Sequence, residues 1–178
     1  MGVGLLGGIK AIFFPAPEPR SLVTADIGDE LVVRGRILPR DLIESPLSGE
    51  RCVYYSYTVD VWQEAVQGLG GDGHWRNVER DEAITEFYLQ TDDERVIVAP
   101  ASAEVTRSTG PKMRDVPYTV IGRRAGEMLL VSGNEVEIRG VLAAADDLYD
   151  DARDYRASPR RLMLTAPDEG TLSIRLLK

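Results

Sequence analysis

The chain has 178 residues, of which 43% are hydrophobic, so it can bury a core as one domain of ordinary size. Its formal net charge is −8, and an acidic surface repels phosphate backbones, which disfavours broad nucleic-acid binding. The single cysteine, Cys52, excludes an intrachain disulfide, and together with the single histidine, His74, it is too little for a zinc site of the finger or RING kind. No segment has the roughly 20 apolar residues that span a bilayer.

The chain begins with an apolar head, residues 1–14, followed by the stiff linker Pro15-Ala16-Pro17-Glu18-Pro19. We therefore divide the chain into residues 1–20, the head and linker, and residues 21–178, the folded domain. Apolar residues of the head recur at helical spacing, although four glycines weaken a helix of its own. Such a stripe can insert into a membrane interface or a partner groove, or it can pack onto its own domain or form an oligomer contact. The head residues expected to meet a partner are Leu5, Leu6, Ile9, Ile12, Phe13 and Phe14.

From Ser21 onward the dominant pattern is the period-two alternation of strands. Strands are expected at 31–38, 52–62, 84–90, 95–98, 135–142, 160–165 and 171–177. Thr91-Asp92-Asp93-Glu94 is the expected turn of a hairpin, and residues 167–170 are the turn before the last strand. Two helical segments are expected, at 143–155 and, as a short turn, within 99–108. The sequence thus predicts an all-β domain, a small barrel or an OB-like sheet with minor helix.

Two strands share a weak internal similarity, since Arg34-Gly35 and Arg139-Gly140 both place a glycine in mid-strand after an arginine. A glycine inside a strand usually marks a bulge or a sharp bend, and bends turn the corners of small barrels. Chance similarity between two amphipathic strands explains the pair equally well.

The turn Ser45-Pro46-Leu47-Ser48-Gly49 and the following Cys52-Val53-Tyr54-Tyr55 resemble the GIDE or "beside a membrane" (BAM) domain. Later features follow in the same order: Trp75-Arg76-Asn77-Val78, Glu86-Phe87-Tyr88-Leu89, and Glu127 with Gly133 before the stretch 135–140. The similarity extends over most of residues 31–177.

The best known relatives implied by this resemblance are membrane-anchored mitochondrial ubiquitin ligases, in which a separate RING does the chemistry. A RING cannot be built from Cys52 and His74, and no transmembrane helix is present in the sequence. The resemblance therefore implies an interaction domain and not a ligase, and only the head is left as a possible membrane contact.

Candidate catalytic and metal sites are weak. Ser48, Cys52 and His74 could be proposed as nucleophile and base, but no motif brings them together, and we interpret them as a turn, a strand and a loop residue. We therefore predict no catalytic residue, no cofactor and no enzyme activity. The acidic run Asp146, Asp147, Asp150, Asp151 and Asp154 lacks the EF-hand spacing, and a solvated face is favoured over weak binding of a divalent cation.

Aromatic residues cluster in the part of the chain that resembles the family. Alternation places Tyr55 and Tyr57 on the apolar face of their strand and Tyr54 and Trp62 on the other, where they could meet a partner. The first hypothesis is a non-enzymatic GIDE/BAM-like interaction module, cytoplasmic or peripheral to a membrane. It would present one barrel face and the apolar head to a protein or lipid partner, or to further copies of itself. The alternative is an OB-like domain that binds single-stranded nucleic acid, which the net charge disfavours.

Overall fold

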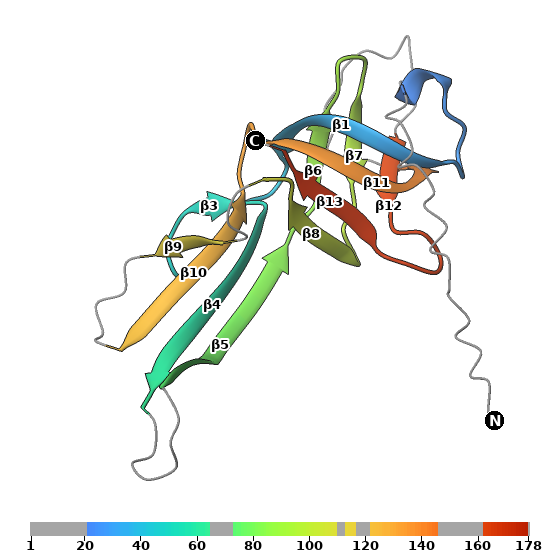
Figure 1. Ribbon diagram of the computed structural model, residues 1–178. Helices are drawn as coiled ribbons and strands as arrows, with labels where there is room; N and C mark the ends of the chain where they lie inside the picture. Colours follow the sequence, from blue (N-terminus) through green and yellow to red (C-terminus); the bar gives the residue numbers. More distant parts are fainter. Residues whose placement is uncertain (1–20, 65–72, 110–112, 117–121, 146–161, 178) are drawn as a thin grey trace, which may run out of the picture.

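The computed structural model describes residues 21–64, 73–109, 113–116, 122–145 and 162–177. These residues form an all-β structure, as the alternation predicts (Figure 1). The helical content of the described part is a single 3-10 turn, η1 (Leu22–Thr24), in which the amide of Val23 donates to the hydroxyl oxygen of Ser21.

Five strands close into a barrel in the order β1, β6, β7, β12, β11 and back to β1. The first three follow one another along the chain, and β11 returns by a long connection to lie beside β1, which is a Greek key. The fifth strand, β12, pairs parallel to β7 and antiparallel to β11. This is a five-stranded Greek-key barrel of the OB type, within the predicted fold class. The bounds are β1 (Glu30–Pro39), β6 (Phe87–Gln90), β7 (Arg95–Val98), β11 (Glu135–Ala144) and β12 (Leu162–Thr165).

The two mid-strand glycines mark the places where β1 and β11 change partners. Along β1, pairing passes from β11 to β6 at Arg36, next to Gly35. Along β11, pairing passes from β13 to β12 around Gly140. A Cβ at Gly35 would lie 2.4 Å from the carbonyl oxygen of Gln90, and one at Gly140 would lie 2.7 Å from that of Thr165. Both glycines are therefore needed because another strand's backbone approaches closely at these positions.

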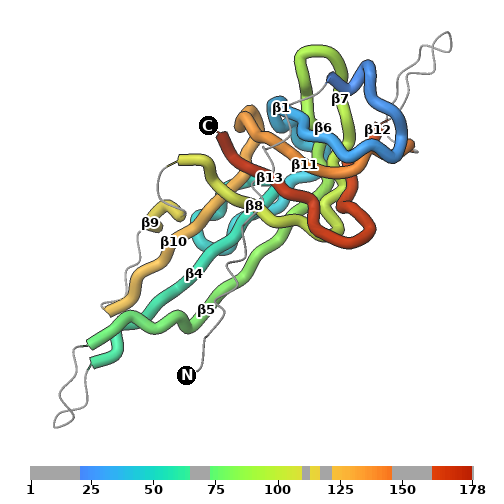
Figure 2. The backbone as a smooth tube through the Cα atoms, turned by 45° about the vertical axis from the view of Figure 1, so that its right-hand side comes forward, coloured from blue at the N-terminus to red at the C-terminus, as the bar shows by residue number. Residues whose placement is uncertain are grey.

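A second sheet projects from the barrel as an arm, which Figures 1 and 2 both show running away from the closed strands. Its order is β5-β4-β10-β9. Two insertions build it: β4 and β5 lie between the barrel strands β1 and β6, and β9 and β10 lie between β7 and β11. The bounds are β4 (Tyr54–Gln63), β5 (His74–Ile84), β9 (Arg114–Val116) and β10 (Arg123–Leu130).

Four further strands connect the arm to the barrel. β13 (Leu172–Leu176) pairs with β11, and β8 (Ala103–Arg107) pairs parallel to β13, which extends the barrel sheet to seven strands. β2 (Ile43–Glu44) and β3 (Arg51–Cys52) form a short hairpin at the base of the arm.

The main hydrophobic core fills the barrel and continues into the base of the arm. Barrel residues such as Phe87, Leu89 and Ile138 are fully buried, and Val53 and Leu130 from the base of the arm belong to the same cluster. Leu22 of η1 packs into this cluster as well. A second, small cluster lies on the arm and consists of Tyr57, Val59 and Ala125, with Leu47, Tyr55 and Val116 packed against it.

The structure corrects several expectations. Within the segment 99–108, where a helical turn was expected, residues 103–107 form the strand β8, because Val105 packs into the main core. The expected helix 143–155 is wrong at its start, since Ala143 and Ala144 end β11, and residues 146–155 lie outside the described part. His74, expected in a loop, is the first residue of β5.

Candidate functional site

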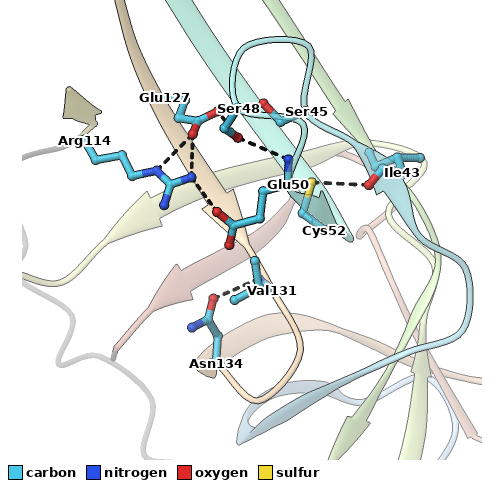
Figure 3. A network of polar contacts seen from close by, with 9 residues as sticks. All are labelled: Ile43, Ser45, Ser48, Glu50, Cys52, Arg114, Glu127, Val131 and Asn134. Carbon is cyan, nitrogen blue, oxygen red and sulfur yellow. Dashed lines mark hydrogen bonds and ion pairs between the residues drawn. The ribbon is translucent and has the colours of Figure 1, made fainter. Parts of the chain in front are cut away.

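A buried carboxylate, Glu127, lies at the centre of the polar network in Figure 3. Its side chain is fully buried, and Tyr57 and Arg114 are its cross-strand neighbours. The hydroxyls of Ser45 and Ser48 donate to one carboxylate oxygen, Oε2, at 2.6 and 3.1 Å. Arg114 donates to the other oxygen, Oε1, from Nε at 2.9 Å and from Nη2 at 2.5 Å. All of the carboxylate's strong acceptor positions are therefore used within the protein.

The loop that supplies the two hydroxyls is folded by its own sequence. The amide of Gly49 donates to the carbonyl of Ser45, and the amide of Ser45 donates to the carbonyl of Glu50. Gly49 has a φ of +70°, a conformation that glycine adopts without strain. Leu47 points from this loop onto the second hydrophobic cluster. The loop thus lies over the arm face that carries Glu127.

The hydrogen bonds keep Glu127 ionised. Burial is the largest single influence and opposes ionisation, but the hydrogen bonds from Ser45, Arg114 and Ser48 together outweigh it, so the pKa of Glu127 is lowered. Arg114 also donates to Glu50 at 2.7 Å, and these two carboxylates raise the pKa of the guanidinium. The cluster is an ion-paired clamp that joins β9, β10 and the β2–β3 loop.

Cys52 lies close to this clamp but is not activated by it. The thiol is buried and contacts the carbonyl of Ile43 at 3.7 Å. Burial, followed by the negative charges of Glu127 and Glu50, raises its pKa to about 11. The thiol is therefore protonated at neutral pH, which is the opposite of what a nucleophile needs.

The structure does not bring together the three residues considered as nucleophile and base. Ser48 donates its hydroxyl proton to Glu127, which pairs with Tyr57 on β4, whereas His74 pairs with Gln63 at the other end of β4. Six residues of strand separate these two positions, which is about 20 Å. A proton transfer between Ser48 or Cys52 and His74 would need hydrogen-bond reach, which this separation denies.

The far end of the arm carries the chain's two tryptophans, Trp62 and Trp75. They are direct cross-strand partners on β4 and β5, with ring centroids 5.4 Å apart in an edge-to-face arrangement. Trp62 is 44% exposed and Trp75 is 37% exposed. The prediction that Trp62 faces solvent is confirmed, and Trp75 joins it as a neighbour that the sequence did not single out. The sequence did contain a signal for this pairing: Trp62 and Trp75 lie on either side of one glycine-rich segment, as cross-strand partners in a hairpin do.

A polar group fixes the orientation of the tryptophan pair. The guanidinium of Arg124 lies 4.6 Å from the Trp75 ring centroid and donates to Asp60 at 2.9 Å. Asn77 donates to the other oxygen of Asp60 at 3.1 Å, and this bond, with those from Arg124, lowers the pKa of Asp60 against the effect of burial. The charges of Asp60 and Arg124 offset each other, so the exposed rings stand beside a neutral pair.

Tyr54 is the one candidate partner residue that the structure contradicts. It was expected on an exposed face, but it is 6% exposed and belongs to the main core. The reason is that both faces of β4 are buried at its base: Leu47 of the β2–β3 loop packs on the side of Tyr57, and Tyr54 on the other side joins the main core. Tyr57 was expected on the apolar face and is buried, as predicted. It donates its hydroxyl to Glu79 at 2.8 Å. That bond, with burial, raises the pKa of Tyr57 to about 12.

A cleft of about 310 Å³ separates this face of β4 from β8. The hydroxyl residues Tyr54, Ser56 and Thr58 line one side, and Glu104 and Thr106 of β8 line the other. Met113 and Met128 also border it. The cleft has a mixed lining and no concentration of one charge.

The remaining sequence candidates lie outside the described residues. These are the head residues between Leu5 and Phe14 and the acidic run Asp146 to Asp154. Among the residues that are described, no three side chains of the His, Cys, Asp or Glu type are placed to hold a metal ion together. The same part of the chain contains no helix with the length and hydrophobicity to span a bilayer.

Comparison with known proteins adds no relative: no family model, no curated protein and no solved structure matches the chain.

Proposed function

We propose that this protein is a non-enzymatic interaction module of the GIDE/BAM type, which binds a protein or lipid partner through its arm and its apolar head. The observation that carries the proposal is the exposed pair Trp62 and Trp75 at the far end of the arm. Tryptophan is enriched among the residues that dominate binding energies, because its large ring loses little conformational entropy on burial.

The geometry around the rings supports a binding role. The rings are held by each other and by Arg124, so they are ordered before a partner arrives, which lowers the cost of binding. The groups that could have acted as nucleophiles are occupied elsewhere: both loop hydroxyls serve Glu127, and the Cys52 thiol is protonated. These features favour recognition over catalysis.

A photo-crosslinking amino acid at position 62 tests the proposal in cells that express the full chain. The matched control places the same amino acid at Glu169, an exposed residue in the β12–β13 turn. A discrete crosslinked partner at position 62, lost with Trp75→Ala and missing at position 169, supports the proposal. Equal crosslinking at both positions, or none at either, contradicts it.

The head is tested separately by liposome flotation of the full chain beside a version that starts at Pro15. If only the full chain floats, the partner of the head is lipid, and the protein is peripheral to a membrane. If neither floats, the head contacts protein, either another protein or a second copy, and a cytoplasmic location without membrane contact is the better proposal.

The alternative function, binding of single-stranded nucleic acid, is favoured by one observation, the OB-type order of the barrel strands. The net charge of −8 opposes it. Titration with an oligothymidylate at low salt distinguishes the two functions. Binding that weakens steeply with added salt would favour the alternative, and no binding would remove it.

A further inference from the structure

The strand β8 leaves one edge of the barrel sheet open. It is the last strand in the order of that sheet, and among the described residues it pairs only with β13. The amide of Leu172 on β13 donates to the carbonyl of Ser102, directly before β8. Backbone groups of successive residues in a strand point to alternate sides, so Ala103 and Val105 direct their amide and carbonyl groups away from β13. These groups are the hydrogen-bonding positions of the open edge.

The open edge borders the cleft between β8 and the arm. Four consecutive residues of β8, 103–106, line that cleft. Successive side chains point to opposite faces of a strand, so one cleft reaches all four residues only along the edge of the strand. Figures 1 and 2 both place β8 between β13 and the arm, so the edge that faces the arm is the one that β13 leaves open. The edge that lines the cleft is about 10 Å long.

The two faces of β8 give the cleft an apolar side and an acidic side. Val105 and Met128 belong to the main core, and Met113 packs against it. Both methionines line the cleft. On the opposite face of β8, Glu104 is exposed and forms no ion pair with another described residue. A chain segment beside β8 therefore meets apolar groups on one face and a carboxylate on the other.

We infer that the cleft binds an extended peptide segment of a partner protein, which adds to the open edge of β8 as a further strand. In this mode of recognition, main-chain hydrogen bonds give affinity and alternate side chains give specificity. The backbone groups of Ala103 and Val105 supply the hydrogen bonds. The cleft volume of about 310 Å³ lies at the lower end of the range for ligand sites, so the segment inside it is short.

The chemistry of the cleft defines the sequence of the segment. Its side chains on the side of Val105 are apolar and pack on the two methionines, whose flexible thioethers adapt to different shapes. Its side chains on the side of Glu104 are basic, because an unpaired carboxylate attracts a cation. The partner segment thus alternates apolar and basic residues.

A capped heptapeptide of alternating valine and lysine tests the inference by fluorescence anisotropy with the full chain. Two further versions carry backbone N-methyl groups, one on every valine amide and the other on every lysine amide. Only one of these two sets of amides faces β8, so one version should bind at least tenfold more weakly than the parent peptide and the other should not. No binding of the parent peptide at millimolar concentration, or equal binding of the two methylated versions, overturns the inference.

Point variants of the full chain place the peptide on β8. Ala103→Pro removes one donor of the open edge and no hydrogen bond to β13, at the first residue of a strand, where proline is tolerated. It should weaken binding about three- to tenfold. Glu104→Lys should weaken binding about two- to fivefold, whereas Glu169→Lys, the same change of charge in the β12–β13 turn, should not. Equal binding to Glu104→Lys and Glu169→Lys would show that the peptide binds elsewhere and would overturn the inference.

The inference goes beyond the proposed function, which rests on the tryptophan pair at the far end of the arm. The two can fail separately. A crosslinked partner at position 62 without peptide binding leaves the proposed function in place and removes the site on β8. Peptide binding that depends on Ala103 and Glu104, without a crosslink at position 62, supports the site on β8 and contradicts the role of the tryptophans.

Discussion

At the scale of single residues, Glu127 has the widest influence in the arm. A carboxylate with no exposure to solvent is stable only when its charge is paired and its oxygens are hydrogen-bonded. Here the partners come from the β2–β3 loop and from β9, so one ionised side chain fixes the position of two segments on β10.

Replacing Glu127 with alanine should lower the free energy of unfolding by about 2–3 kcal/mol, because two hydroxyls and a guanidinium lose their acceptor in a buried setting. Urea denaturation measures the loss. The matched control is Glu135→Ala, which removes a contact of 3.5 Å between partly exposed side chains and should cost less than about 1 kcal/mol. Equal losses in the two variants would contradict the clamp.

The lowered pKa of Glu127 predicts a specific dependence of stability on pH. In the unfolded chain a glutamate has a pKa of about 4.3, and in the folded chain this value is lower. The stability that the charge contributes is therefore complete above the unfolded value and is lost as the pH falls through the folded value. The stability difference between the native protein and Glu127→Gln should shrink as the pH is lowered below about 4. A difference that is constant from pH 7 to pH 3 would show that the charge contributes nothing.

Cys52 should react with thiol reagents only when the protein opens. Its pKa of about 11 leaves almost no thiolate at pH 8, and the side chain is buried. Labelling of the native protein should be slow at pH 8, and labelling in concentrated urea should be rapid. Rapid labelling of the native chain would contradict the assigned position of Cys52.

At the scale of strands, the two glycines at the partner switches decide whether the barrel can close. Gly140→Ala would place a Cβ 2.4 Å from a side-chain carbon of Leu172 and 2.7 Å from the carbonyl oxygen of Thr165. We expect a loss of at least about 2 kcal/mol in urea denaturation. Gly126→Ala, another glycine within a strand, meets its nearest atoms at 3.4 Å and should be tolerated far better. Equal losses of stability in Gly140→Ala and Gly126→Ala would show that the backbone around Gly140 can accommodate a Cβ.

The strands of the barrel could be predicted from the sequence because one of their faces is buried. The alternation of apolar and polar residues predicts the bounds of four strands closely, β1, β7, β11 and β13. The position of the β6–β7 turn was predicted as well. β5 was missed because its first nine residues are all exposed, so it has no alternation to detect. β8 was missed because a single residue, Val105, packs into the core.

The candidate site was harder to predict, because alternation assigns faces but not partners. Ser45 and Glu127 are 82 positions apart, and only the pairing of β4 with β10 and the fold of the loop bring them together. Tyr54 was placed on a solvent face because one covered face was assumed for β4, whereas both are covered at its base. Trp62 lies beyond that covered part, so its exposure was predicted correctly.

At the scale of the whole molecule, the arm and the barrel should unfold together. Val53, Tyr54, Met128 and Leu130 from the base of the arm belong to the same core as the barrel strands. Tryptophan fluorescence reports only on the arm, since both tryptophans lie there, whereas far-UV circular dichroism reports on all strands. The two urea transitions should coincide. An earlier transition in fluorescence would show that the arm frays as a separate unit.

The division of the arm between two insertions has a consequence for synthesis on the ribosome. The hairpin of β4 and β5 is local and can pair as soon as residue 84 has emerged, but its neighbour β10 is made about forty residues later. The end of β1 can pair with β6 earlier, but its other part waits longer still, since Glu30 pairs with Val141. The nascent chain therefore carries unpaired strand edges through most of its translation, and its yield in cells should depend on chaperones that cover such edges until β11 and β12 arrive.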